Sequence, residues 1–140
     1  MDYVYLITPF CAWLLAGTLK FLVNSMRAGQ LASGLIGYGG LPSNHSAIVS
    51  SMVALVAIRE SIESAAFGVA LTVAFVVMMD AASLRKQVGK QAAVINDLSR
   101  RLGSNAPPLR ERIGHTKIEI FAGIGVGALV GVLIATLLPK

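Results

Sequence analysis

The feature that most constrains this chain is a series of long apolar runs separated by polar or glycine-rich residues. Residues 118–138 are long enough to cross a bilayer unaided, because a transmembrane helix needs about 20 apolar residues. Residues 4–26 form a second long run. Residues 46–58 and 65–79 are shorter and reach a spanning length only when their polar ends are included. The runs therefore predict a chain that crosses a membrane about four times.

Composition agrees with this prediction and excludes other classes. Hydrophobic residues make up 55% of the chain and charged residues only 14%, whereas soluble domains carry about a quarter charged residues. The single cysteine, Cys11, allows no disulfide within one chain and no cysteine metal cluster. The net charge is +5, but no aromatic and basic platform accompanies it, so we expect no nucleic-acid partner.

We therefore expect an all-α integral membrane protein with a single domain over residues 1–140. It should be a bundle of about four transmembrane helices plus one interfacial amphipathic helix. The spans are predicted at about residues 4–26, 43–60, 64–84 and 116–138.

The amphipathic helix is predicted at about residues 86–102. Its apolar face should carry five side chains at helical spacing, namely Val88, Ala92, Ile95, Leu98 and Leu102. Such a helix lies at the membrane interface or packs on the bundle. Residues 28–41 are rich in glycine and are predicted to form a loop, partly re-entrant.

The basic residues are distributed asymmetrically over the predicted topology. With four spans, residues 27–44 and 85–117 lie on one side and carry nine lysines and arginines. The other side carries two, Arg59 and Lys140. The positive-inside rule therefore assigns the two long connections to the cytoplasm.

Lys20 lies near the cytoplasmic end of the first span. A lysine at mid-bilayer costs about 2.5–3.5 kcal/mol on insertion scales, and less where it can reach the interface. Its ammonium group either snorkels to the interface or is directed at an anionic group.

The second span begins at Ser43, which is a suitable helix N-cap. The free N–H groups at a helix start form a natural phosphate site. A cap accounts for Ser43 or Asn44 but not for a histidine in the first turn. His45 is therefore a candidate site residue.

Asp80 and Arg85 close the third span. Five residues apart, they share a helical face less well than residues three or four apart. Arg85 is either an ordinary interface anchor or a site residue. Asp80 is harder to explain as a surface residue, because a carboxylate at membrane depth normally has a partner.

The fourth span begins after Gly114 and His115. Thr116 and Glu119 fit a capping box, which would bind the glutamate to the backbone. Alternatively, Glu119 pairs with His115 four residues earlier, fixes its tautomer and raises its nucleophilicity. The sequence leaves both alternatives open.

Glycines recur every four residues along the fourth span. Such a stripe lets another helix approach closely. The partner is either a helix of the same chain or a second copy, so a homo-oligomer through this face is expected as one possibility. The stripe consists of Gly123, Gly127 and Gly131.

The unusual polar residues of all four spans fall at the same membrane face. They are Lys20, His45, Asp80, Arg85, His115 and Glu119. Two cations, two histidines and a helix N-terminus suit phosphoryl transfer better than metal chemistry. The histidines lack the spacing of a zinc motif, so we expect no metal and no cofactor.

Residues 39–47, Gly-Gly-Leu-Pro-Ser-Asn-His-Ser-Ala, resemble the signature of the divergent branch of type-2 phosphatidic acid phosphatases. That branch is related to acid phosphatases and vanadium-dependent haloperoxidases. The similarity continues in residues 80–85, 89–92, 95–96 and 114–119. It covers most of the chain from Lys20 to about Gly127.

The resemblance implies a role for each matching residue. His115 would attack phosphorus and form a phosphohistidine, oriented by Glu119, while His45 would protonate the leaving oxygen. The phosphate would be held by Lys20, Arg85, Ser43 and Asn44, and supporting positions would be Asp80, Gly40 and Gly114.

The sequence departs from the parent family at two points. The carboxylate is Glu119 rather than the usual aspartate. Arg85 lies far upstream of His115, whereas the parent family has an arginine shortly before the nucleophile. Arg110 is therefore an alternative phosphate ligand.

The predicted function is a metal-independent membrane phosphatase that hydrolyses an isoprenoid or glycerolipid phosphate or diphosphate, with its site at the cytoplasmic face. Its partners would be the lipid phosphate and the surrounding membrane lipids. One alternative is a non-catalytic membrane scaffold that binds lipid phosphates. A solute pathway is disfavoured, because the outer half of every span is nearly free of polar residues.

Overall fold

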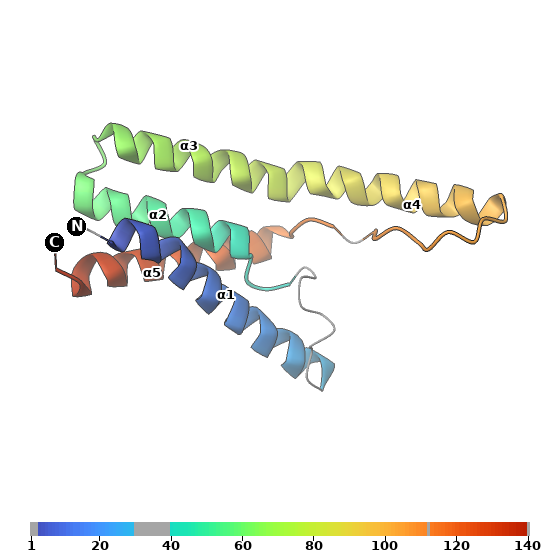
Figure 1. The fold of residues 1–140 in the computed structure, drawn as a ribbon, viewed down its shortest axis with the longest axis horizontal. Helices are drawn as coiled ribbons and strands as arrows, with labels where there is room; N and C mark the ends of the chain where they lie inside the picture. The colour runs from blue at the N-terminus through green and yellow to red at the C-terminus, as the bar shows by residue number, and fades with distance from the viewer. Residues whose placement is uncertain (1–2, 30–39, 112, 140) are drawn as a thin grey trace.

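The computed structural model describes residues 3–29, 40–111 and 113–139, and the regular structure in these residues is helical. Most of the predicted glycine-rich loop lies outside the described residues. The elements in order are α1 (Val4–Ala28), α2 (Asn44–Glu60), α3 (Ala65–Met79), the π-helix η2 (Asp80–Leu84), α4 (Arg85–Arg101) and α5 (Lys117–Leu137) (Figure 1).

Local capping chemistry explains where three of these helices begin. Ser43, Ser64 and Thr116 each take an extended backbone conformation just before a helix. Each side chain then accepts a hydrogen bond from the backbone N–H three residues later, which satisfies one of the free donors of the first turn. The predicted N-cap at Ser43 is thus confirmed.

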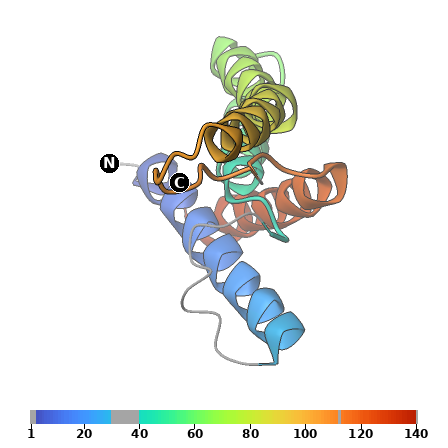
Figure 2. The ribbon, with the colours of Figure 1, turned by 90° about the vertical axis from the view of Figure 1, so that its right-hand side faces the viewer.

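Helix α2 is the centre of the bundle. It packs against α1, α3 and α5, and most extensively against α5. Figure 2 shows α2 in the middle with these helices around it, and Figure 1 shows the C-terminal half of α1 diverging from the others. Several small polar side chains of α2 are buried, including Ser46, Ser50 and Ser51. Small residues let the neighbouring backbones come close, which is how membrane helices gain packing energy.

The glycine stripe of α5 packs against this face of α2. A Cβ atom added at Gly123, Gly127 or Gly131 would lie 2.4, 2.1 or 2.3 Å from a backbone carbonyl oxygen of α2 or its cap. Of the two partners predicted for the stripe, the structure therefore shows a helix of the same chain. The homo-oligomer expected through this face would need another surface, because α2 already covers this one.

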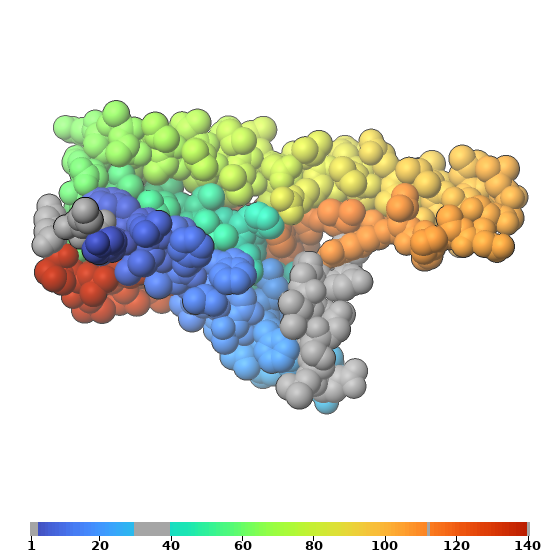
Figure 3. Space-filling view, in the orientation of Figure 1, coloured from blue at the N-terminus to red at the C-terminus, as the bar shows by residue number. Residues whose placement is uncertain are grey.

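Helices α3, η2 and α4 form one continuous rod. Met79, Leu84 and Arg85 all have right-handed helical dihedral angles. Residues 65–101 span about 55 Å at 1.5 Å per residue, almost twice the hydrocarbon thickness of about 30 Å. Figures 1 and 3 show α4 projecting beyond the bundle, with the segment that leads to α5 running back along it.

The predicted interfacial position of the 86–102 helix stays a prediction, but the alternative of packing on the bundle is wrong. The reason is that no turn separates it from α3, so it continues in the direction of that helix. The segment between α4 and α5, described at residues 102–111 and 113–116, is the returning segment. It contacts α4 at Asn96, whose side-chain amide donates 2.8 Å hydrogen bonds to the Leu109 carbonyl and to Glu111. The covered face consists of Gly89, Ala92 and Asn96.

Within the part of the chain that the structure describes, three helices are long and apolar enough to cross a membrane, namely Val4–Ala28, Ala65–Arg101 and Lys117–Leu137. The expectation of a helical membrane protein is confirmed at this level. Among the described residues, α2 does not meet the same measure, since it has 17 residues and several buried polar groups. Of the roughly four predicted spans, three thus correspond to helices that meet this measure.

The two termini and the α2–α3 turn lie at one end of the bundle (Figure 1). Side chains tie this end together, because the Tyr5 hydroxyl donates to Glu60 and the Arg59 guanidinium donates to the Leu138 carbonyl. The starts of α2 and α5 and the π-helix consequently lie toward the opposite end. The candidate site residues are found there.

Candidate active site

His115 and Glu119 form a shielded pair where the chain enters α5. His115 Nδ1 lies 3.3 Å from Glu119 Oε2, and the two side chains are only 9% and 12% exposed. A carboxylate next to Nδ1 favours the tautomer that carries its proton on that nitrogen. The lone pair of Nε2 is then available to attack an electrophile.

The capping box at this position is also present. Glu119 Oε2 accepts a 2.9 Å hydrogen bond from the Thr116 backbone N–H, and Thr116 Oγ1 accepts from the Glu119 N–H. The sequence presented the cap and the histidine pair as competitors, yet one carboxylate oxygen serves both. The cap therefore fixes the carboxylate that orients His115.

His45 lies in the first turn of α2 and faces His115. The two ring centroids are 5.9 Å apart, with the ring planes tilted by 55°. His45 Nδ1 is buried and has no hydrogen-bond partner among the described residues. Both imidazoles can therefore contact one small group placed between them.

The start of α2 is held directly against the start of α5. The Ser43 backbone N–H donates a 2.9 Å hydrogen bond to the Glu119 carbonyl. The Ser43 side chain is fully buried and accepts from Ser46 Oγ at 3.1 Å. These bonds fix the separation of the two histidines. They also engage the Ser43 hydroxyl as an acceptor at a fully buried position, so its predicted role as a phosphate ligand stays a prediction.

Asn44, the other predicted phosphate ligand of α2, lies beside α1. A Cβ atom at Gly17 would be 3.7 Å from Asn44 Nδ2. The other amide atom, Oδ1, is buried without a partner among the described residues. A buried amide oxygen without a partner is costly, which indicates a position that a ligand or water completes.

The π-helix joins the third span to the His115–Glu119 pair. The Ala81 carbonyl accepts a 3.1 Å hydrogen bond from the His115 backbone N–H. Gly114 precedes this contact with φ +99°, and a Cβ atom there would lie 3.2 Å from the Lys86 backbone nitrogen. Gly40 has φ +153° and lies against the Asn24 side chain of α1. Both supporting glycines thus occupy backbone positions that disfavour other residues.

The same π-helix aligns Asp80 with Arg85. Arg85 Nε donates to Asp80 Oδ2 at 2.8 Å, and the Arg85 backbone N–H bonds to the Asp80 carbonyl. A π-helix pairs residues five apart, so the spacing that stacks poorly in an α-helix is correct here. No described residue bonds the two terminal nitrogens of Arg85, which leaves its planar fork for an anion.

Position and electrostatics distinguish Arg85 from Arg110 as candidate phosphate ligands. The charges of Lys20 and Arg85 both act on His115, and Lys20 also lies within electrostatic range of Glu119. Arg110 is exposed in the returning segment beside Asn96. Asn96 is eleven residues beyond Arg85 along the helix, or about 16 Å. The position of Arg85 therefore suits a site at the histidines, and that of Arg110 does not.

Burial lowers the pKa of His115 below its ordinary value of 6.5, and the charges of Lys20 and Arg85 lower it further. The hydrogen bond and the charge of Glu119 act in the opposite direction. The net effect keeps this imidazole neutral at neutral pH, which is the state a nucleophile needs.

The site contains two groups that sequence patterns did not single out. The Ala81 carbonyl and the Ser46 hydroxyl position the histidine and the cap, respectively. Neither residue type carries a functional signal in the sequence. Within residues 3–29, 40–111 and 113–139, no group of three histidine, cysteine, aspartate or glutamate side chains could hold a metal ion.

Comparisons with known proteins agree with the resemblance seen in the sequence. The model of the Divergent PAP2 family matches residues 1–130. The uncharacterized membrane protein YuiD of Bacillus subtilis (strain 168) is 30% identical over 146 aligned residues, which cover 93% of this chain and 92% of that protein. No solved structure matches the chain at a significant level. The chain belongs to the Divergent PAP2 family.

Proposed function

We propose that this protein is a metal-independent membrane phosphatase that hydrolyses a lipid phosphate or diphosphate through a phosphohistidine at His115. The observation that carries the proposal is the shielded His115–Glu119 pair with the His45 ring 5.9 Å away. One imidazole is oriented by a carboxylate and the other is not. That asymmetry supports a nucleophile and a separate proton donor.

The cationic groups around the pair support a phosphate substrate. Lys20 and Arg85 supply positive charge, and the first turn of α2 supplies free backbone N–H groups at the positive end of the helix dipole. Arg85 is held by Asp80 through Nε alone, so both terminal nitrogens can bind two phosphate oxygens.

The surroundings of the pair support a lipid rather than a soluble phosphate. Ile118 and Phe121 flank Glu119 in the first turns of α5, and they are 73% and 70% exposed. In a bilayer these side chains face acyl or prenyl tails. A head group bound at His115 would therefore leave its tail along the apolar surface of α5.

The reaction then proceeds in two displacements. Burial and the charge of Arg85 lower the pKa of His45 as well, but a bound phosphate anion favours its charged form. Neutral His115 attacks phosphorus through Nε2, the bond from phosphorus to the lipid oxygen breaks, and protonated His45 gives its proton to that oxygen. In the second step neutral His45 takes a proton from water, the water oxygen attacks the phosphohistidine, and phosphate leaves. Both histidines return to their starting states. We infer from the charge distribution that the site faces the cytoplasm.

The alternative is a scaffold that binds lipid phosphates without turnover, since it would use the same cationic groups. Phosphate release by the purified protein separates the two. The assay should present phosphatidic acid, phosphatidylglycerophosphate and prenyl mono- and diphosphates in micelles, with and without EDTA. We expect at least one lipid to be hydrolysed by wild type in EDTA and not by His115→Ala. Equal release by both proteins would overturn the proposal, and binding without release would support the scaffold.

A further inference from the structure

The projecting helix α4 has an apolar face that nothing in the described chain covers. The returning segment lies on Gly89, Ala92 and Asn96, whereas the neighbouring face remains open. Ile95, Leu98 and Leu102 are 48%, 55% and 75% exposed on it. The rod is almost twice as long as the hydrocarbon core of a bilayer, so lipid cannot cover its whole length, and α4 is the part that projects beyond the bundle.

The open face has the period of a coiled coil. Its residues are 84, 88, 91, 95, 98 and 102, and steps of four and three alternate along this α4 stripe. This is the a and d pattern of a heptad repeat. The a positions hold Val88, Ile95 and Leu102, and the d positions hold Leu84, Gln91 and Leu98. β-branched residues at a with leucine at d favour two parallel strands.

We propose that α4 forms a parallel two-stranded coiled coil with α4 of a second copy of this chain. Copies inserted in one membrane share an orientation, so their α4 rods emerge from the same face and run in parallel. Holding two copies in one membrane also raises their effective concentration, which compensates for a short interface.

Gln91 points to an identical partner. It is the one polar residue in the stripe, and its amide contains both a donor and an acceptor. At a d position the same residue of each copy meets across the two-fold axis. Two Gln91 side chains can therefore hydrogen-bond to each other, and a single polar core residue of this kind fixes the register.

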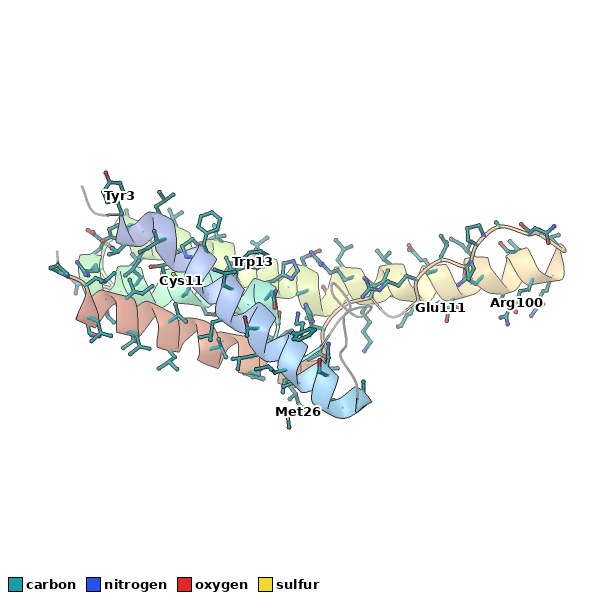
Figure 4. All side chains as sticks on the ribbon, turned by 60° about the horizontal axis from the view of Figure 1, so that its bottom comes forward. Tyr3, Cys11, Trp13, Met26, Arg100 and Glu111 are labelled. Atoms are coloured by element: carbon teal, nitrogen blue, oxygen red, sulfur yellow. The ribbon has the colours of Figure 1, made fainter. Side chains whose placement is uncertain are left out.

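The charges of α4 do not oppose this pairing. Lys86, Lys90, Asp97 and Arg100 fall at the outward c and f positions of the same heptads. The two arginines that flank the stripe already have carboxylate partners, since Arg85 binds Asp80 and Arg101 binds Asp97, each at 2.8 Å. Figure 4 shows Arg100 and Glu111 on this projecting part of the molecule, away from the bundle.

Disulfide scanning in liposomes tests the proposal. In a Cys11→Ser background, single cysteines replace Ile95 and Leu98 on the stripe and, as matched controls, Lys90 and Arg100 on the outward face. Mild oxidation should cross-link the stripe variants as dimers and leave the controls monomeric, even when the protein is diluted with excess lipid. Equal cross-linking at all four positions, or none at the stripe, would overturn the proposal.

A charge substitution gives an independent measurement on the full chain. Ile95→Glu should weaken dimerisation by about tenfold or more, because a carboxylate would be buried at an a position. Arg100→Glu, on the outward face, should leave it unchanged. Light scattering in detergent gives the mass of each, and circular dichroism verifies that both variants keep their helix content. A wild-type monomer at every protein concentration tested would contradict the proposal.

Discussion

The rings of His45 and His115 lie 5.9 Å apart because the Ser43 N–H bonds the Glu119 carbonyl, which joins the first turns of α2 and α5. His45 lies two residues after Ser43, and His115 lies four residues before Glu119. The geometry of the candidate site thus depends on close contact between two helices. Substitutions that separate α2 from α5 should therefore affect both stability and activity.

Gly127→Ala should destabilise the protein by about 1–3 kcal/mol. Its added methyl group would lie 2.1 Å from the Ala47 carbonyl oxygen, so the two backbones must move apart. Gly125→Ala is the matched control on the same helix, since a Cβ atom there meets nothing within 4 Å. It should change stability little or raise it by up to about 1 kcal/mol. Thermal unfolding in detergent measures both, and equal melting temperatures would contradict the packing described.

Glu119→Gln should reduce kcat by about 10²-fold or more, because a neutral amide cannot stabilise the imidazolium-like character of His115. The amide oxygen can still accept the Thr116 N–H, so the helix cap survives in this variant. Phosphate release under saturating lipid measures the effect.

Thr116→Ala provides the complementary change. It removes the hydroxyl that accepts the Glu119 N–H and should cost about 1 kcal/mol of stability. Its kcat should stay within about tenfold of wild type, because the carboxylate and His115 remain. If Thr116→Ala were as inactive as Glu119→Gln, the cap rather than the histidine pair would be the role of the glutamate.

The sequence predicted much of this arrangement and missed specific parts of it. Apolar runs and the Ser43 and Thr116 caps are local signals, so the helices and the end at which the polar residues gather could be predicted. The π-helix could not, because residues 80–84 have ordinary helical character, and its bond from the His115 N–H to the Ala81 carbonyl joins segments far apart in the sequence. The direction of α4 was missed for the same reason, since no residue marks the absence of a turn.

Arg85→Lys should lower kcat/KM for a lipid phosphate by about tenfold or more. Lysine has a single nitrogen, so it cannot hold Asp80 with one nitrogen and present two others to the phosphate in a planar fork. The ion pair itself contributes less than about 1 kcal/mol to folding, because both side chains are more than a third exposed. Melting temperature should therefore change little.

Arg110→Lys is the control for this change, since Arg110 lies about 16 Å along α4 from the level of Arg85. Its kcat/KM should remain close to that of wild type. A larger loss at Arg110 than at Arg85 would transfer the phosphate-binding role to the returning segment.

Stability should fall as the pH is lowered below about 6.5. The folded-state pKa of His115 lies below its unfolded value of 6.5, because burial disfavours the charged ring. Between the folded-state and unfolded-state pKa values of His115, the unfolded chain binds more protons than the folded chain does. Stability therefore rises with pH in this range. The contribution of His115 is complete above pH 6.5 and is lost as pH falls through this range. Melting temperatures from pH 5 to 8 should show a shallower slope for His115→Gln than for wild type.

The most direct test is to trap the phosphoenzyme. Wild-type protein should be mixed with a hydrolysable lipid carrying labelled phosphate and quenched in alkali, where phosphohistidine survives. We expect label on the protein, assigned to His115 by peptide mass spectrometry and absent from His115→Ala. Label on His45 instead, or hydrolysis by wild type with no labelled histidine at any quench time, would contradict it.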